Sequence, residues 1–210
     1  MKLYQSTSSP NSRRVRIYLA EKGISMPIVP VDLGAREHFS DAYAAINPRR
    51  VVPTLVLDDG TAIGEVPAII RYLEEVYPEP PLSGTHPLAR AQVAMWERRI
   101  EQEGFASVME AVRNSVASLK NRAIAGPHDY AQIPELVERS RQRVQNFYAD
   151  FDARLAGVPF MAGETFSVAD ITALVTVDFA TKAAGLPIEN KRVALKRWYA
   201  SVSSRPSMTA

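Results

Sequence analysis

Hydroxyl and amide side chains are concentrated in a loop just before the first predicted helix. A short predicted strand at residues 2–6 leads into this loop, which offers Ser6, Thr7, Ser8, Ser9, Asn11 and Ser12. The free N–H groups at a helix start favour negative charge, and a neighbouring hydroxyl or amide adds a hydrogen-bond donor. These residue types therefore suit the stabilisation of an anion, but the chemistry alone does not choose among the six.

If that anion is a thiolate, a ligand must supply it. The chain contains no cysteine, which excludes disulfides, thiolate metal sites and a cysteine nucleophile. His86 and His128 lie beside prolines in predicted loops and have no partner at metal-ligand spacing. The sequence therefore predicts no metal site, and any thiol chemistry requires a bound thiol.

A second candidate region spans residues 47–66. Val52 precedes Pro53, and a predicted strand begins there and ends at an Asp-Asp-Gly turn in which Gly60 is available for positive φ. A proline at a strand start cannot donate to the sheet, and we predict that its peptide bond is cis. This pattern predicts that the backbone of Val52 faces outward as a docking edge.

An acidic residue stands where the next predicted helix begins. Glu65 and Val66 follow the second arm of the predicted hairpin, and Pro67 suits the first position of a helix. We therefore expect this helix start to lie beside the backbone edge at Val52.

The elements that must position these groups fall into two predicted domains. Residues 1–77 give the order βαβαββα, with the second strand predicted at a sheet edge because it contains two prolines. Three prolines and a glycine at 78–84 interrupt all periodicity, and we assign 78–86 as a linker. Residues 87–210 show no strand pattern and are predicted to be all-helical.

Within this helical domain, one long helix is predicted from Pro87 to Ala125 and a second up to Gly157. Ser167 and Asp170 have the spacing of an N-terminal capping box before a nearly all-apolar helix. The apolar composition predicts that this helix lies at the centre of the domain.

Composition limits the classes of function. The chain has 210 residues, is 46% hydrophobic and carries 25 basic against 23 acidic residues. Such a balanced charge argues against a nucleic-acid partner. No stretch approaches the roughly 18 apolar residues of a membrane-spanning helix, and no secretion signal is evident at the start, so we expect a cytoplasmic location.

A strand that begins at proline, a turn, a second strand ending in Glu65 and a helix together resemble the glutathione half of the glutathione S-transferase superfamily. The resemblance covers nearly the whole chain, since the capping box also resembles the C-terminal domain of that superfamily. It implies an α/β thioredoxin-like N-terminal domain followed by an all-α domain, and glutathione as the co-substrate. By this resemblance, Val52 and Pro53 bind the cysteinyl unit, and Glu65 and Val66 hold the γ-glutamyl end.

The same resemblance places the activating group in the first loop. Alignment of Arg14 to Ile17 with zeta-type transferases puts their essential serine at Ser9, and the segment up to Asn11 is similar to that of nu-type bacterial transferases. We therefore predict Ser9 and Asn11 as catalytic. The alternative is that Ser9 and Ser12 only cap the first helix, with Ser12 the more natural cap. Tyr4 is the rival activating group, although its place inside a strand favours a core role.

Two positions depart from the family pattern and weaken expected glutathione contacts. Val66 stands where a serine commonly donates its hydroxyl to the γ-glutamyl carboxylate. Val51 stands where a longer polar side chain often reaches the glycyl end, so His38 or Arg50 is a candidate for that carboxylate, with a solvated role as the alternative for each.

The resemblance implies a transferase that activates glutathione for attack on a hydrophobic electrophile, as a homodimer. We expect the electrophile in a cleft lined by Phe105, Met109, Val112 and Val116. Glutathione-dependent disulfide reduction, zeta-like isomerisation and a non-catalytic transferase-like binding protein are the alternatives.

Overall fold

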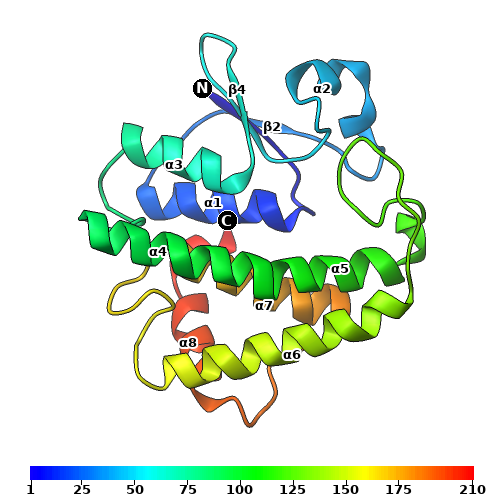
Figure 1. Cartoon of the computed structure of the whole chain (residues 1–210). Coiled ribbons are helices and arrows are strands. Elements are labelled where there is room, and N and C mark those ends of the chain that lie inside the picture. Colours follow the sequence, from blue (N-terminus) through cyan, green and yellow to red (C-terminus); the bar gives the residue numbers. More distant parts are fainter. The chain divides into compact units, whose positions relative to one another are not determined.

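A computed structural model describes all 210 residues and divides them into two compact units (Figure 1). The first contains Met1–Pro80, Ala125–His128 and Thr209–Ala210. The second contains Pro81–Ile124 and Asp129–Met208. The domains predicted at 1–77 and 87–210, joined by a linker at 78–86, stay a prediction.

The first unit has the predicted βαβαββα order. Its main elements are β1 (Lys2–Gln5), α1 (Pro10–Lys22), β2 (Ile28–Pro30), α2 (Asp41–Ile46), β3 (Thr54–Val56), β4 (Ala62–Gly64) and α3 (Val66–Val76), with a short 3-10 turn at Glu37–Phe39. The sheet order is β2-β1-β3-β4, in which β1 runs parallel to β2 and antiparallel to β3, and β3 pairs antiparallel with β4. The predicted edge position of β2 is thus confirmed, and this is the thioredoxin-like arrangement.

Local sequence signals account for the hairpin that carries β3 and β4. Gly60 has a φ of 88°, a backbone conformation that favours glycine. The Gly60 N–H donates to the Leu57 carbonyl over 3.1 Å, and the Leu57 N–H donates to the Thr61 carbonyl over 2.9 Å. The turn therefore fixes the register that brings Thr54 opposite Gly64.

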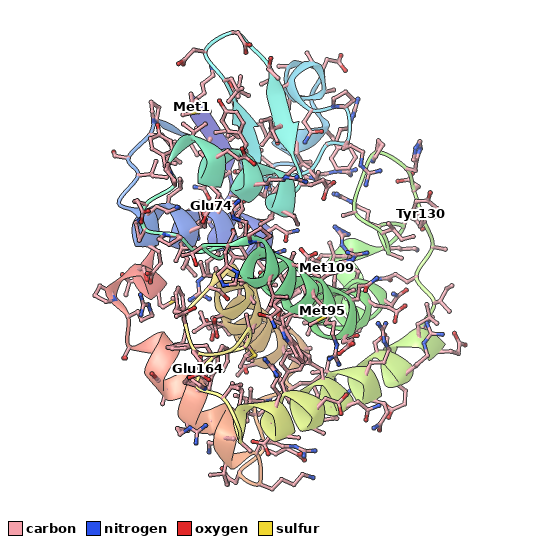
Figure 2. All side chains as sticks on the ribbon, turned by 60° about the vertical axis from the view of Figure 1, so that its left-hand side comes forward. Met1, Glu74, Met95, Met109, Tyr130 and Glu164 are labelled. Carbon is pink, nitrogen blue, oxygen red and sulfur yellow. The ribbon has the colours of Figure 1, made fainter.

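Helices α1 and α3 lie side by side in this unit (Figure 1). Between them, the Tyr18 hydroxyl donates to Glu74 Oε2 over 2.5 Å, and Lys22 Nζ lies 3.0 Å from the same oxygen. Figure 2 labels Glu74 on α3. The fully buried Lys22 ammonium also donates to the carbonyls of Tyr77 and Pro80. One buried cation thus fixes the end of α3 and the chain that follows it.

The second unit contains only helices among its regular elements, as predicted. They are α4 (Pro87–Arg99), a π-helical stretch (Ile100–Phe105), α5 (Ala106–Ser115), a 3-10 turn (Ala117–Leu119), α6 (Glu135–Leu155), α7 (Val168–Ala184), α8 (Val193–Ser203) and a terminal 3-10 turn (Pro206–Thr209). Helix α7 packs against α4, α5 and α8, and 12 of its 17 residues are buried. The predicted central position of this helix is confirmed.

The first long helix of this unit is shorter than predicted. The sequence suggested one helix as far as Ala125, but α5 ends at Ser115. Asn114 Oδ1 accepts the Ile133 N–H over 2.8 Å, and the Gln132 side chain donates to the carbonyls of Arg113 and Val116. Gln132 thus satisfies one carbonyl of the last turn and that of the C-cap residue Val116, and the end of the helix is tied to the segment at 132–133.

The predicted capping box at the start of α7 is confirmed. The Ser167 N–H donates to Asp170 Oδ2 over 3.0 Å, and the Ser167 side chain accepts from the backbone of the third helical residue. Asp170 Oδ1 also accepts from the Met161 N–H and from Trp198 Nε1. The cap therefore joins three separate segments of the helical unit.

Candidate functional site

Ser9 lies at the N-terminus of α1 and is only 8% exposed. Its Oγ accepts the Ser12 N–H over 3.2 Å, which makes it the cap of the helix. A hydroxyl that accepts one hydrogen bond still carries its own proton as a donor. Ser9 can therefore cap α1 and donate to an anion at the positive end of the same helix.

Ser12 does not cap the helix, and that prediction is wrong. Ser12 is fully buried, and its Oγ accepts the Ser6 N–H over 3.2 Å. The Ser9 N–H donates back to the Ser6 carbonyl over 3.2 Å. Ser12 thus braces the loop in which Ser9 sits, and this bracing limits how far Ser9 can move.

Asn11 lies in the first turn of α1 and is half-buried. Its Oδ1 accepts from Arg14 Nη1 over 3.3 Å. The oxygen is engaged by this contact, so the Nδ2 group, which carries both donors of the side chain, is the end that can serve a ligand. Ser9 and Asn11, two residues apart in the sequence, are therefore two donor side chains at one helix start.

The peptide bond between Val52 and Pro53 is cis, as predicted. The Val52 side chain packs in a small hydrophobic cluster with Val31 and Tyr43. The sheet register begins at Thr54, and no hydrogen bond within the chain uses the N–H or C=O of Val52. Its main chain is therefore able to pair with an extended ligand, as an unpaired strand edge does.

A polar network that sequence reasoning missed fixes this segment. The Val51 carbonyl accepts from the Tyr43 hydroxyl over 2.7 Å and from Asn47 Nδ2 over 3.1 Å. Asn47 Nδ2 also donates to Thr54 Oγ1 over 2.8 Å. Burial raises the pKa of the Tyr43 phenol, so it remains a neutral donor. The available sequence signal was Asn47, because asparagine in a turn often hydrogen-bonds to nearby backbone groups.

Glu65 immediately precedes α3 and has an unusual backbone conformation. Its φ is 64° with ψ at 124°, a combination rarely found outside glycine. Its carbonyl accepts from the Ala68 and Ile69 N–H groups, but its side chain is exposed and makes no cap hydrogen bond. The backbone at Glu65 is thus strained, and the Glu65 carboxylate does not cap the helix that follows it.

Val66 begins α3, one residue before the predicted start, so Pro67 is the second helical residue. The Val66 side chain is buried and supports the core. It offers no hydroxyl, and Pro67 offers no N–H. The polar contribution of this helix start is therefore limited to the Glu65 carboxylate and the Val66 N–H.

The two candidates for the glycyl carboxylate have different surroundings. His38 lies in the 3-10 turn before α2, is 5% exposed and packs its ring against Phe39 at 4.5 Å between centroids. Arg50 is partly exposed, and its Nη1 donates to the Phe39 carbonyl over 2.7 Å. A fixed, partly exposed guanidinium is better suited to a carboxylate than a buried ring.

The chain matches known proteins along most of its length. Residues 3–81 match the family model described as "Glutathione S-transferase, N-terminal domain", and residues 134–201 match "Glutathione S-transferase, C-terminal domain". Glutathione S-transferase 2 of Saccharomyces cerevisiae is 33% identical over 211 residues, which cover 99% of this chain and 88% of that protein. This chain belongs to the glutathione S-transferase family.

Solved structures agree with this family assignment. A glutathione S-transferase domain-containing protein of Marinobacter aquaeolei superposes with a TM-score of 0.91 at 36% identity, covering 99% of this chain and all of that one. Gtt2 of Saccharomyces cerevisiae gives a TM-score of 0.90 at 32% identity, covering all of this chain and 99% of that one. Maleylacetoacetate isomerase of Pseudomonas aeruginosa is 48% identical, but only over 94 residues, or 44% of each chain. The fold and the family are therefore established.

Tyr4, the rival activating group, is half-buried and packs against the core of the first unit. It lies in β1, packs edge-on against Tyr43 at 6.2 Å between centroids, and contacts the hydrophobic cluster that holds Val52. The Lys2 ammonium lies 5.4 Å from the centre of its ring. These contacts hold the ring but do not engage the hydroxyl, so Tyr4 stays the alternative donor to Ser9.

The predicted pocket residues differ in exposure. Phe105 and Val112 are buried in the helical unit, where Phe105 lies 6.0 Å from the Phe179 ring of α7. Met109, labelled on α5 in Figure 2, and Val116 are half-buried. Met109 and Val116 therefore retain more apolar surface for a ligand than Phe105 and Val112 do.

The remaining charged groups form no metal centre. No group of three or more histidine, aspartate or glutamate side chains could hold a metal ion. No helix combines the length and apolar character needed to cross a bilayer.

Proposed function

We propose that this chain is a glutathione transferase that activates the thiol of glutathione with Ser9, assisted by Asn11. The Ser9 hydroxyl donates to the sulfur, so the thiolate is favoured and the thiol proton leaves to solvent. The thiolate then attacks an electrophilic carbon and forms a carbon–sulfur bond. Either a leaving group departs with its electron pair, or a conjugated double bond is saturated when its other carbon takes a proton from solvent. Two hydrogen-bond donors at a helix start suit this chemistry because they stabilise the charged nucleophile.

The required stabilisation lies within reach of these donors. A free thiol has a pKa of about 8.5, and lowering it by about two units requires roughly 2.7 kcal/mol of preference for the thiolate. A hydrogen bond to a charged group is worth roughly 1.5 to 3 kcal/mol. One donor from Ser9 and one from Asn11 are therefore sufficient.

The proposed glutathione contacts follow the peptide from centre to ends. The main chain of Val52, next to Pro53, pairs with the cysteinyl unit. Glu65 faces the α-ammonium of the γ-glutamyl end, and the Val66 N–H donates to its carboxylate. Arg50 is our choice for the glycyl carboxylate, with His38 the alternative.

The observation that carries this proposal is Glu65. Its side chain is exposed and unbonded, while its φ of 64° imposes a backbone cost of roughly 1 to 3 kcal/mol. The side chain makes no contact that would account for this strain, and such strained residues are often found at ligand sites. An α-ammonium is the complementary group for this carboxylate.

The other parts of the proposal rest on family membership. The co-substrate is a small hydrophobic electrophile, with Met109 and Val116 its contacts ahead of the more buried Phe105 and Val112. A homodimer and a cytoplasmic location stay predictions.

Calorimetric titration of glutathione tests the proposal. Wild type is expected to bind glutathione, and Glu65→Gln to weaken binding by up to about fivefold if the ion pair is exposed, and by more if it is desolvated. Glu75→Gln, on the exposed surface of α3, is the matched control and should bind as wild type does. No binding to wild type would refute the transferase proposal, and equal binding by Glu65→Gln would place the γ-glutamyl end elsewhere.

A further inference from the structure

Arg14 is a buried cation beside the proposed thiol site. It lies in the second turn of α1, is 2% exposed and is among the largest fully buried side chains of the molecule. Among its interactions, Nη1 donates to Asn11 Oδ1 over 3.3 Å. The guanidinium is therefore in direct contact with one of the two proposed thiolate donors.

Helix stability alone does not account for arginine at this position. The first turn of α1 contains no acidic residue, and a cation near a helix N-terminus opposes the helix dipole. Burying an ion is costly even when it is paired, and an apolar side chain of similar volume is often neutral or stabilising in its place. A role of Arg14 beyond helix stability is therefore expected, and its contact with Asn11 indicates one.

The contact with Asn11 determines what the asparagine can offer a ligand. An amide side chain can present either its acceptor oxygen or its donor nitrogen, and these are opposite in their effect on an anion. A guanidinium has donors only, so it holds the amide with the oxygen turned toward Arg14. The Nδ2 group is then the part that remains for the ligand.

We propose that Arg14 is a positioning residue for thiolate formation, which acts through Asn11. It holds the amide of Asn11 so that the nitrogen, not the oxygen, is presented beside the Ser9 hydroxyl. This inference rests on the proposed transferase function, because the group that receives the hydrogen bond is the glutathione sulfur. A guanidinium is suited to this task because its geometry is planar and its charge is permanent.

A double-mutant cycle on the glutathione complex tests the inference. Thiolate absorbance is measured against pH for wild type, Arg14→Met, Asn11→Leu and the double variant, together with kcat and KM for a chromogenic aryl halide. Arg14→Met is expected to raise the pKa of the bound thiol by about one unit and to lower kcat about tenfold, with KM changed less than threefold. Asn11→Leu is expected to do the same.

The cycle separates action through Asn11 from an independent effect. If Arg14 acts through Asn11, the double variant is no worse than Asn11→Leu alone. Effects that add, or a thiol pKa that is unchanged in Arg14→Met, would overturn the inference. A wild type that binds no glutathione would instead refute the transferase function itself, so the two failures are distinguishable.

Two further variants keep the test decisive if Arg14→Met does not fold. Arg14→Lys retains the charge without the planar geometry and should recover part of the thiol pKa shift. Asn11→Asp keeps an acceptor for Arg14, and makes that contact stronger, but has no N–H for the sulfur. It should raise the thiol pKa at least as much as Asn11→Leu does, and a thiol pKa equal to that of wild type would overturn the inference.

Discussion

Two helix starts in this molecule use an acidic residue in opposite ways. At α7, Asp170 is fully buried and accepts hydrogen bonds from Ser167, Met161 and Trp198. At α3, the side chain of Glu65 is exposed and unbonded, and the backbone that carries it is strained. The buried carboxylate has no remaining capacity for a ligand, whereas the exposed one serves no structural purpose. The comparison separates a structural cap from a binding site.

The largest expected effect comes from removing the structural cap. Asp170→Ala leaves the buried donors of Ser167, Met161 and Trp198 without an acceptor, which should lower the free energy of unfolding by about 3 to 5 kcal/mol. Chemical denaturation measures this loss. Asp150→Ala, on the exposed face of α6, is the control and should change stability by less than about 0.5 kcal/mol. Equal losses in the two variants would contradict the structural role of Asp170.

The same carboxyl predicts a pH dependence. Burial raises the pKa of Asp170 to about 6, outweighing the hydrogen bonds that favour its charged form. The folded pKa lies above the unfolded value of about 3.9, so this contribution to stability is complete below about pH 4 and is lost as the pH rises through 6. The unfolding free energy of wild type minus that of Asp170→Asn should fall by up to about 3 kcal/mol between pH 4 and pH 7. A difference independent of pH would contradict the raised pKa.

The next effect concerns Ser9, which combines both roles by capping a helix and offering a donor. Ser9→Ala should lower the free energy of unfolding by about 0.5 to 2 kcal/mol through loss of the cap. It should lower kcat by about 10- to 100-fold, and affinity for glutathione much less, because the lost hydrogen bond serves the thiolate. Ser8→Ala, an exposed neighbour in the same loop, is the control. Unchanged turnover in Ser9→Ala, with activity abolished by Tyr4→Phe, would make Tyr4 the donor.

The smallest effect returns to the α3 start. Val66→Ser introduces the hydroxyl that this helix start lacks, and should tighten glutathione binding about tenfold. Because the Val66 side chain is buried, the same change should cost about 1 to 2 kcal/mol of stability. Calorimetric titration with glutathione measures the affinity of this variant, and chemical denaturation measures its stability. Stability that falls without any gain in affinity would mean that the γ-glutamyl carboxylate lies elsewhere.

Sequence reasoning succeeded where short-range signals determine structure. Gly60 at the hairpin turn and the Ser167–Asp170 capping box are local patterns, and both formed as predicted. It failed where distant residues decide the outcome. The end of α5 depends on Gln132 and Ile133, and no property of the helix sequence reveals those contacts.

The candidate site shows the same division. The positions of Ser9, Val52 and Glu65 follow from the order of elements that the sequence predicted. The assignment of the cap to Ser9, with Ser12 bracing the loop, does not follow from that order. Both are serines near one helix start, and only the folded loop distinguishes them. The support of the Val51 carbonyl by Tyr43 and Asn47 likewise appears only when α2 packs beside β3.

The pKa of glutathione bound to the wild-type protein tests the central claim most directly. Thiolate absorbance is titrated against pH for saturating protein and for free glutathione under the same conditions. If the start of α1 is a thiolate site, the bound thiol titrates about two units below the free one. A bound thiol that titrates with the pKa of free glutathione would contradict the claim that Ser9 and Asn11 stabilise the thiolate.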